Sequence, residues 1–283
     1  MTYEELWHSL TTVYDTGEAR AVARWLMEVA FGLTMTDIIG GGMEKLSDAE
    51  QQRLSTMQQR LLKGEPVQYV TGKADFGPIQ IDVAPGVLIP RPETYELCQW
   101  VLSSFSGKPQ KQDNLLTVLD IGTGSGCIAC TLALQLAEAK VTAWDISAEA
   151  LAIAQRNAAL LQVGVTFERR DALQLPTEQN RWDVIISNPP YICQQEQKDM
   201  ERHVLEHEPH LALFVPDDSP LLFYRAIAHY ARKALRNQGE LFFEINPLYC
   251  EELLTMLREE GLEQTEVRCD QFGKRRFVKA IRL

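Results

Sequence analysis

The sequence of 283 residues has no apolar run that approaches the ~20 residues needed for a membrane-spanning helix. Its opening stretch, Met1–His8, lacks the basic and apolar segments of a secretory signal peptide. Basic residues are scarce as well, since 28 lysines and arginines face 39 acidic residues and the formal net charge is −11. A protein that depends on phosphate contacts usually carries a basic face. We therefore expect a cytoplasmic protein that requires neither a membrane nor nucleic acid.

Metal and redox motifs are also sparse. The six cysteines are scattered and form no disulfide framework, and a cytosolic chain would keep them reduced. Cys127 and Cys130 have C-x-x-C spacing, but no second pair or neighbouring histidine completes a zinc site. Three histidines lie close together, at positions 203, 207 and 210, but Pro209 interrupts any helix that would carry them. We therefore predict no metal site and expect a loop over a substrate pocket here.

The first part of the chain is helical in pattern. Residues 1 to about 63 place apolar residues at helical spacing, and Ser47–Glu50 matches a capping box before a helix that runs to about Lys63. We predict a small all-α N-terminal domain over residues 1–72. Such a domain could serve only for packing or could recognise a protein substrate, and we assign it to substrate recognition. Residues 73–92 are predicted to form a connecting β-hairpin, in which Val87–Ile89 can pair with the alternating stretch Ile79–Val83.

Residues 93–283 form the second predicted domain. A helix begins at Glu93 and ends near Ser104, and a polar loop spans 106–114. Seven strands are predicted at 115–120, 140–145, 165–168, 183–187, 240–245, 262–268 and 276–281, with helices near 125–138, 148–161, 219–236 and 247–260. This alternation predicts an α/β fold with a mainly parallel, Rossmann-like sheet. The last two strands must be antiparallel, because Asp270–Lys274 is too short for a crossover helix.

A glycine-rich loop follows the first strand of this series. It reads Asp-x-Gly-x-Gly-x-Gly, and glycines at a strand-to-helix turn let the backbone approach a ligand closely. The pattern is neither the dinucleotide fingerprint, whose last glycine would fall at Cys127, nor a P-loop. The acid that leads the loop would repel a pyrophosphate and suits a cationic amine. The candidate cofactor-binding residues of this loop are Asp120, Gly122, Thr123, Gly124, Ser125 and Gly126.

Acidic residues end the next two strands. Asp145 lies about 20 residues past Gly124, the spacing at which an acid commonly binds ribose hydroxyls. Asp171 follows the third strand, with Ala172 beside it, and is placed to accept a hydrogen bond from an adenine amino group. Together with the loop, these acids describe an adenosine that carries an amino-acid tail. The predicted cofactor is therefore S-adenosyl-L-methionine.

The segment Asn188–Tyr191, with the sequence Asn-Pro-Pro-Tyr, directly follows a buried strand. Pro189 and Pro190 have no backbone N–H, and a proline restricts the preceding residue to extended conformations. Asn188 is thus held at the carboxyl end of a strand, where open α/β sheets bind ligands. Free carbonyls, the Asn188 amide and the Tyr191 ring suit a clamp for a small planar group that bears an –NH₂. Alone, the same residues would also suit a strand that ends in a surface loop.

These segments resemble the bacterial release-factor glutamine methyltransferases of the PrmC/HemK family. The resemblance rests on Glu65–Gly72, Val87–Thr94, Asp120–Gly126, Asn188–Tyr191, Glu208–Leu213 and Asp270–Phe277. Two positions depart from the family pattern: Tyr95 stands where a second acid is common, and Ala172 where some members have a tryptophan near the adenine. Ala172 is therefore expected to contact the cofactor only through its backbone. The resemblance implies a seven-stranded class I methyltransferase sheet with a small all-α N-terminal domain.

The resemblance also implies the reaction, which is methylation of the glutamine side-chain amide in the Gly-Gly-Gln motif of class I peptide chain release factors. Asn188 Oδ1 and the Pro189 carbonyl can each accept one N–H of that amide, and Tyr191 can pack against its plane. These residues and Pro190 are predicted to be both catalytic and substrate-binding, and Asn188 is assigned to the cofactor-binding residues as well. Catalysis would come mainly from positioning in a desolvated pocket, without a dedicated general base. We expect the chain to act as a monomer.

Two further residues are assigned to the site. Arg91 is flanked by prolines that fix its direction, and it either binds a cofactor carboxylate or forms a structural ion pair. Glu208 is assigned to the substrate site, where it would order the loop. Three alternative functions remain: methylation of a glutamine in a ribosomal protein, methylation of an exocyclic amine of adenine or guanine in a nucleic acid, and a non-catalytic cofactor-binding module.

Overall fold

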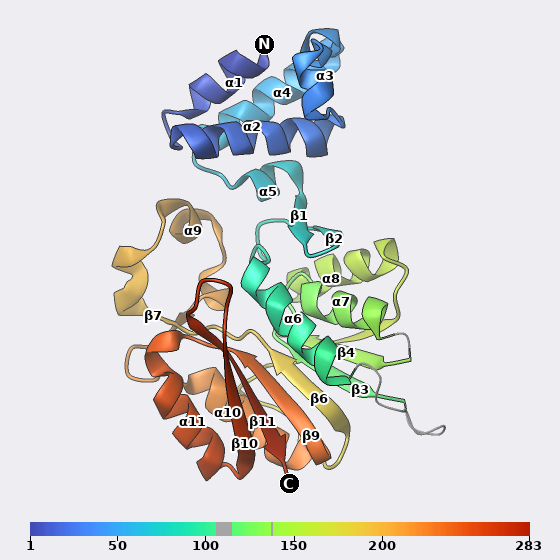
Figure 1. Ribbon diagram of the computed structural model, residues 1–283, viewed down its shortest axis with the longest axis vertical. Coiled ribbons are helices and arrows are strands. Elements are labelled where there is room, and N and C mark those ends of the chain that lie inside the picture. Colours follow the sequence, from blue (N-terminus) through green and yellow to red (C-terminus); the bar gives the residue numbers. More distant parts are fainter. Residues whose placement is uncertain (106–114, 137) are drawn as a thin grey trace. The chain divides into compact units, whose positions relative to one another are not determined.

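A computed structural model describes residues 1–105, 115–136 and 138–283 (Figure 1). The chain divides into two compact units. The first comprises Met1–Ala74, Val83–Pro85 and Glu201–His207, and the second comprises Asp75–Asp82, Gly86–Met200 and Glu208–Leu283. The polar loop expected at 106–114 lies outside the described residues.

The first unit is built from helices, several of which have side-chain caps at their N-termini. Its helices are α1 (Tyr3–Leu10), α2 (Thr16–Phe31), α3 (Met35–Ile39), α4 (Asp48–Leu61), α5 (Val67–Thr71) and, later in the chain, α9 (Arg202–His207), with a 3-10 helix at Gly42–Lys45. Thr2, Thr34 and Ser47 each form a capping box, which satisfies backbone N–H groups that a helix start leaves without partners. The capping box predicted at Ser47–Glu50 is confirmed. The buried core includes Leu6, Leu10, Leu26, Met27, Leu54 and Leu61.

The second unit is organised around a seven-stranded sheet. Its strands are β3 (Thr117–Ile121), β4 (Lys140–Asp145), β5 (Val165–Arg169), β6 (Trp182–Ser187), β9 (Leu235–Glu244), β10 (Leu262–Cys269) and β11 (Arg275–Arg282). Across the sheet the order is β10-β11-β9-β6-β3-β4-β5. The strands from β9 to β5 pair in parallel, whereas β11 is antiparallel to both β9 and β10. The predicted α/β fold and its final antiparallel pair are confirmed.

The strand order reverses at the centre of this sheet. The chain runs from β3 through β4 to β5 at one edge, returns to β6 on the other side of β3, and continues to β9. In open α/β sheets, ligands bind outside the carboxyl ends of the strands beside such a reversal. The residues that follow β3 and β6 therefore occupy the position where this fold places a binding site.

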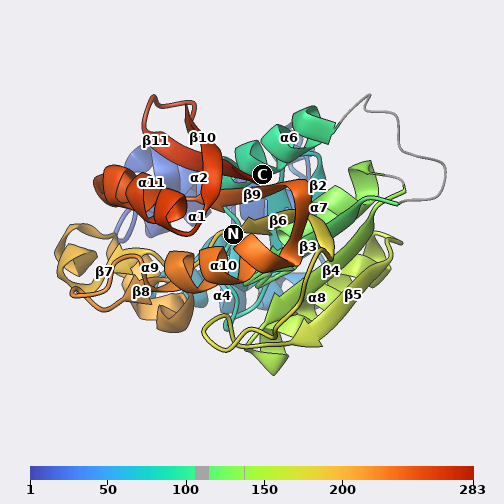
Figure 2. The ribbon, with the colours of Figure 1, turned by 90° about the horizontal axis from the view of Figure 1, so that it is seen from below.

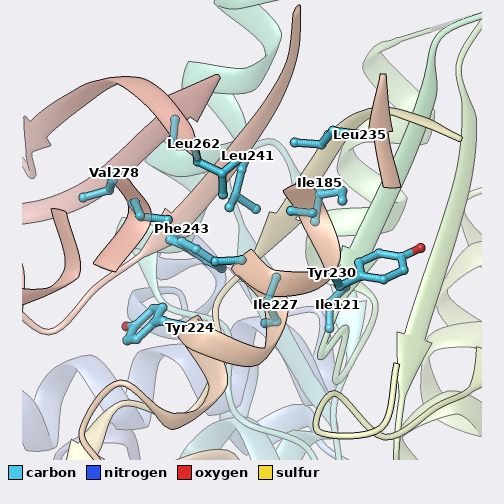
Figure 3. Packing of buried hydrophobic residues seen from close by; sticks show 14 of the residues in the cluster. Ile121, Ile185, Tyr224, Ile227, Tyr230, Leu235, Leu241, Phe243, Leu262 and Val278 are labelled. Atoms are coloured by element: carbon cyan, nitrogen blue, oxygen red, sulfur yellow. The ribbon is translucent and has the colours of Figure 1, made fainter. Parts of the chain in front are cut away.

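Helices cover both faces of the sheet (Figures 1 and 2). The helices α6 (Pro92–Phe105), α7 (Cys127–Gln135) and α8 (Ala148–Leu160) lie on one face, and α10 (Leu222–Ala234) and α11 (Cys250–Glu259) lie on the other. Figure 3 shows the core under α10, where Tyr224, Ile227 and Tyr230 pack with sheet residues such as Ile185 and Phe243. Within the described ranges, no helix combines the length and apolar character that crossing a membrane requires.

Several short elements were not predicted from the sequence. The strand β7 (Ile192–Cys193) pairs in parallel with β8 (Phe214–Val215), and 3-10 helices occupy Gln194–Asp199, His210–Ala212 and Pro247–Tyr249. They are too short to produce a periodic pattern, which is the main signal for an element in a sequence.

The pairing predicted for Val87–Ile89 is wrong. The strand β2 (Ile79–Asp82) pairs instead with β1 (Lys73–Phe76), and Val87–Ile89 forms no strand. The turn between β1 and β2 explains the difference. Gly77 has a φ of +58°, which glycine adopts readily, so the chain reverses directly after β1 and brings that segment beside β2.

Candidate active site

The loop after β3 requires its glycines for two separate reasons. Gly122, Gly124 and Gly126 have φ values of +77°, +55° and +81°, a region that residues with a Cβ rarely adopt. A Cβ on Gly126 would also lie 2.9 Å from the Cβ of Ala154 in α8, so glycine is needed for close packing. The Gly122 N–H donates to the Trp144 carbonyl at 2.8 Å. The loop is thereby tied to the end of β4.

Asp120 lies fully buried beneath this loop. Its Oδ2 accepts the hydroxyl hydrogen of Thr123 at 2.5 Å, and its Oδ1 has no hydrogen-bond partner among the described residues. Burial raises the pKa of this carboxyl to about 7, although the hydrogen bond from Thr123 opposes the rise. Asp120 therefore supports the loop from below and keeps one oxygen that can accept a further hydrogen bond.

Asp145 ends β4, and Asp171 follows β5 by two positions. The two carboxylate oxygens of Asp145 accept N–H groups from Gly124 at 2.8 Å and Ser147 at 2.9 Å. Burial raises the pKa of Asp145, and these backbone donors oppose the rise. Asp171 accepts the N–H of Leu173 at 2.8 Å. A carboxylate oxygen has more than one lone pair, so both acids can accept from a ligand as well.

A cavity of about 400 Å³ opens where the ends of β3, β4, β5 and β6 meet, and this is an ordinary size for a small-molecule site. Its lining includes the predicted site residues Gly122, Gly124, Asp145, Asp171, Ala172, Asn188, Pro189 and Pro190. Much of the remaining lining is apolar and includes Val87, Leu88, Ile121, Trp144, Leu211 and Phe223. The predicted loop residues Asp120, Thr123, Ser125 and Gly126 do not line it and instead shape the loop from within. Separate stretches of sequence thus meet around one cavity.

A buried hydrogen-bond chain holds the Asn188–Tyr191 segment. Nδ2 of Asn188 donates to Oγ1 of Thr94 at 3.0 Å, and the Thr94 hydroxyl donates to Oε2 of Glu244 at 2.7 Å. The Tyr191 hydroxyl donates to Oε1 of the same glutamate at 3.1 Å. Thr94 and Glu244 are only 3% and 2% exposed, and burial raises the pKa of Glu244. Thr94 and Glu244 therefore set the position of the clamp.

Sequence analysis missed Thr94 and Glu244 as functional residues. Thr94 lies in a segment that carried the family resemblance, but nothing nearby in the sequence indicated its partner. Glu244 offered one usable signal, because it is a charged residue inside the otherwise apolar end of β9, and charged residues are seldom fully buried unless paired.

Arg91 and Glu208 form an ion pair with each other. Nη2 of Arg91 lies 2.5 Å from Oε1 of Glu208, and the Ile89 N–H donates to Oε2 at 3.1 Å. The Glu208 side chain is 1% exposed, so Arg91 compensates a buried charge. Neither residue lines the cavity. The structural alternative for Arg91 is thus observed, and direct contact of either residue with a ligand stays a prediction.

The cysteines and histidines are not arranged as a metal centre in the part of the chain that the structure describes, where no group of three His, Cys, Asp or Glu side chains could hold an ion. Cys127 and Cys130 lie in the first turn of α7. Burial raises the pKa of each thiol to about 12, so both are protonated at neutral pH and poorly reactive.

Fold and cavity together define the class of protein. A seven-stranded sheet with a glycine loop after β3, acids after β4 and β5, and Asn-Pro-Pro-Tyr after β6 belongs to a methyltransferase that uses S-adenosyl-L-methionine. Residues 104–211 match the family model described as the methyltransferase small domain, and residues 8–72 match the PrmC N-terminal domain. A methyltransferase from Pyrococcus furiosus shares the fold, with a TM-score of 0.51 and 17% identity over 80% of this chain and 98% of that chain.

Two curated relatives place the chain within this class. It is 43% identical over 275 residues to the release factor glutamine methyltransferase of Bacteroides thetaiotaomicron, and these residues cover 97% of this chain and 96% of the relative. It is 38% identical over 271 residues to the release factor glutamine methyltransferase of Flavobacterium psychrophilum, with 96% and 94% covered. The chain belongs to the family of release factor glutamine methyltransferases. The resemblance drawn from its sequence is confirmed.

Proposed function

We propose that this protein methylates the side-chain amide nitrogen of the glutamine in the Gly-Gly-Gln motif of class I peptide chain release factors. The names of its relatives support a release-factor glutamine as the substrate. The observation that best supports this reaction is the placement of Asn188, which lines the cavity and is held by a hydrogen bond from its Nδ2 to Thr94. Oδ1 is left as an acceptor on the cavity side, and an oriented acceptor suits the –NH₂ of a planar amide.

The cavity residues fit S-adenosyl-L-methionine, which supplies an electrophilic methyl group when bound. The backbone at Gly122 and Gly124 can approach a ligand without hindrance from side chains. Asp145 would accept from ribose hydroxyls with the lone pairs that its backbone donors leave free, and Asp171 would accept from an adenine amino group. Asp120 lies under the loop and does not line the cavity, so its ionised carboxylate would favour a cationic amine above the loop by charge and not by direct contact.

The clamp would act mainly by orientation. An amide nitrogen is a poor nucleophile because its lone pair is delocalised into the carbonyl group. Asn188 Oδ1 and the Pro189 carbonyl each accept one N–H, while Tyr191, held by Glu244, packs against the amide plane. Such positioning can lower a barrier by about 7–11 kcal/mol. The amide proton becomes acidic only after the methyl group has moved, so the chain needs no dedicated general base.

Labelled methyl transfer tests this proposal directly. The purified protein is incubated with labelled S-adenosyl-L-methionine and, separately, with release factor, ribosomal protein and nucleic acid, and the product is mapped by mass spectrometry. We expect label on the glutamine of the Gly-Gly-Gln motif. A release factor in which that glutamine is replaced by alanine is the control and should accept no label. Label confined to ribosomal protein or nucleic acid would refute the assignment.

We also propose that the enzyme acts in the cytoplasm, as a monomer and without nucleic acid. All six cysteines are free and five of them are buried, which suits a reducing compartment. Light scattering after size exclusion tests the oligomeric state. A mass near 32.1 kDa is expected, and twice that mass would contradict the proposal.

A further inference from the structure

The side-chain amide of Asn188 has two ends of nearly the same shape and opposite hydrogen-bonding character. Oδ1 accepts, whereas Nδ2 donates. The clamp attracts an –NH₂ group only when Oδ1 faces the substrate. A half-turn of the amide would present a second –NH₂ and repel the substrate. The surroundings of Asn188 must therefore select one of the two orientations.

The hydrogen-bond chain behind Asn188 makes this selection. A carboxylate only accepts, so Glu244 takes the hydroxyl hydrogen of Thr94 at 2.7 Å. Because Thr94 has a single hydroxyl hydrogen, its oxygen can then only accept from Asn188. Asn188 must turn Nδ2 toward Thr94, at 3.0 Å, and keep Oδ1 for the cavity. We propose that Thr94 and Glu244 are positioning residues that fix the orientation of the Asn188 amide and thereby the preference of the clamp for an –NH₂ group.

The three partners come from three different elements, which makes the arrangement a property of the tertiary structure. Thr94 lies in α6, Glu244 ends β9, and Asn188 follows β6. Both Thr94 and Glu244 are buried, so water does not compete for their hydrogen bonds. The Tyr224 hydroxyl donates to the backbone carbonyl of Glu244 at 3.0 Å and holds the end of the strand.

Glu244 also positions the other side of the clamp. Its second oxygen accepts the Tyr191 hydroxyl at 3.1 Å, so one carboxylate holds both polar side chains of the Asn-Pro-Pro-Tyr segment. The guanidinium of Arg276, on the neighbouring strand β11, attracts this carboxylate and favours its ionised form. The ionised form is the one that accepts from Thr94 and Tyr191 at the same time.

The central test compares two substitutions of Thr94. Thr94→Val removes the hydroxyl and nearly keeps the shape, so the Asn188 amide loses its selected orientation. We expect kcat for the release factor to fall at least about tenfold, equivalent to about 1.4 kcal/mol. Thr94→Ser keeps the hydroxyl and should hold kcat within about threefold of the wild type. Affinity for S-adenosyl-L-methionine, measured by calorimetry, should stay unchanged in both variants.

A second threonine provides a matched control. Thr131 in α7 is also fully buried, and its hydroxyl has no hydrogen-bond partner among the described residues. Thr131→Val makes the same chemical change in the same unit and should leave kcat unchanged. A similar loss in Thr94→Val and Thr131→Val would show a general packing effect and would overturn the proposal.

A double-mutant cycle asks whether Thr94 acts through Asn188. In an Asn188→Ala background there is no amide left to orient, so Thr94→Val should lower kcat no further. Losses that multiply would show that Thr94 acts independently of Asn188. Binding provides a readout apart from turnover: with S-adenosylhomocysteine present, Thr94→Val should weaken the binding of a Gly-Gly-Gln peptide, and Thr94→Ser should restore it.

Glu244→Gln tests the carboxylate itself. A glutamine has a donor end as well as an acceptor end, so it no longer fixes the direction of the chain: when Nε2 donates to Thr94, the Thr94 hydrogen can reach Asn188 and the selection reverses, so kcat should fall. A folded Glu244→Gln variant with wild-type kcat would overturn the role of Glu244, and if this variant does not fold, the Thr94 pair decides. This inference rests on the proposed function, but different results would contradict the inference and the proposed function. If the wild type methylates another acceptor instead, the proposed function is wrong, and the same variants are compared on that acceptor.

Discussion

Replacement of Asn188 by alanine should separate methyl transfer from cofactor binding. The side chain makes one structural hydrogen bond, from Nδ2 to Thr94 at 3.0 Å, and its Oδ1 is the proposed acceptor for the substrate amide. Thr94 keeps its bond to Glu244 after the change, so the loss of stability should be about 1 kcal/mol. Loss of one preorganised hydrogen-bonding group in an active site lowers kcat by about 10²–10³-fold, or about 2.7–4 kcal/mol. We expect a fall of that size for Asn188→Ala.

The assay is single-turnover methyl transfer to a release factor, with calorimetric titration of S-adenosyl-L-methionine and thermal unfolding on the same preparations. Affinity for the cofactor should stay within about twofold, because Asp145 and the glycine loop are untouched. Asn237→Ala removes the same side chain from an exposed position near the start of β9 and should change nothing. Turnover of Asn188→Ala within a few-fold of the wild type would refute the clamp reasoning.

Three further predictions concern the cofactor site, the loop and the pH dependence. Asp145→Ala removes the acceptor proposed for the ribose and frees the Gly124 N–H, so calorimetry should show binding of S-adenosyl-L-methionine at least about tenfold weaker, and unchanged affinity would remove Asp145 from the site. Gly126→Ala forces alanine into a left-handed φ, which costs about 1–2 kcal/mol, and places its Cβ 2.9 Å from Ala154, which costs about 1–3 kcal/mol. The free energy of unfolding should therefore fall by the sum of the two. Its control, Gly261→Ala, has a similar φ of +74° and open space, so equal losses in the two variants would contradict the packing argument. Burial raises the pKa of Glu244, so its ionised form is lost as pH falls through a value above that of an ordinary glutamate, and kcat should decline over that range. The titratable and charged groups around it are Glu93, Cys98, Tyr191, Tyr224 and Arg276. A pH–kcat profile should lose this acid limb in Glu244→Gln, and an unaltered limb would assign it to another group.

Much of the site was predictable because its residues directly follow strands. The glycine loop, Asp145 and Asn188 each come at the end of an apolar run, and Asp171 comes two positions after the strand β5. Parallel strands bring their carboxyl ends to one edge of a sheet, so residues that are far apart in sequence had to meet there. The cavity lining bears this out for Gly122, Asp145, Asp171 and Asn188 together.

The wrong pairing predicted for Val87–Ile89 has a different cause. Alternation predicts a strand at Ile79–Val83, with Val87–Ile89 as its expected partner, whereas the structure places the partner before it in the chain. A turn of two residues at Gly77 and Pro78 makes β1 the neighbour of β2. Hairpin partners depend on turn geometry, and alternation of apolar residues carries no information about which flanking segment pairs.

By itself, the sequence determined the α/β fold, the family, and the backbone of the glycine loop and of the Asn-Pro-Pro-Tyr segment, because each depends on short stretches of residues whose backbone preferences are local. Only the tertiary structure decided the partners of buried polar groups. Thr94 and Glu244 lie 150 positions apart, and Arg91 and Glu208 lie 117 apart. A buried hydrogen-bonding or charged group must find a partner wherever packing supplies one. Sheet order and helix packing, which no local pattern encodes, therefore chose the residues that hold the clamp.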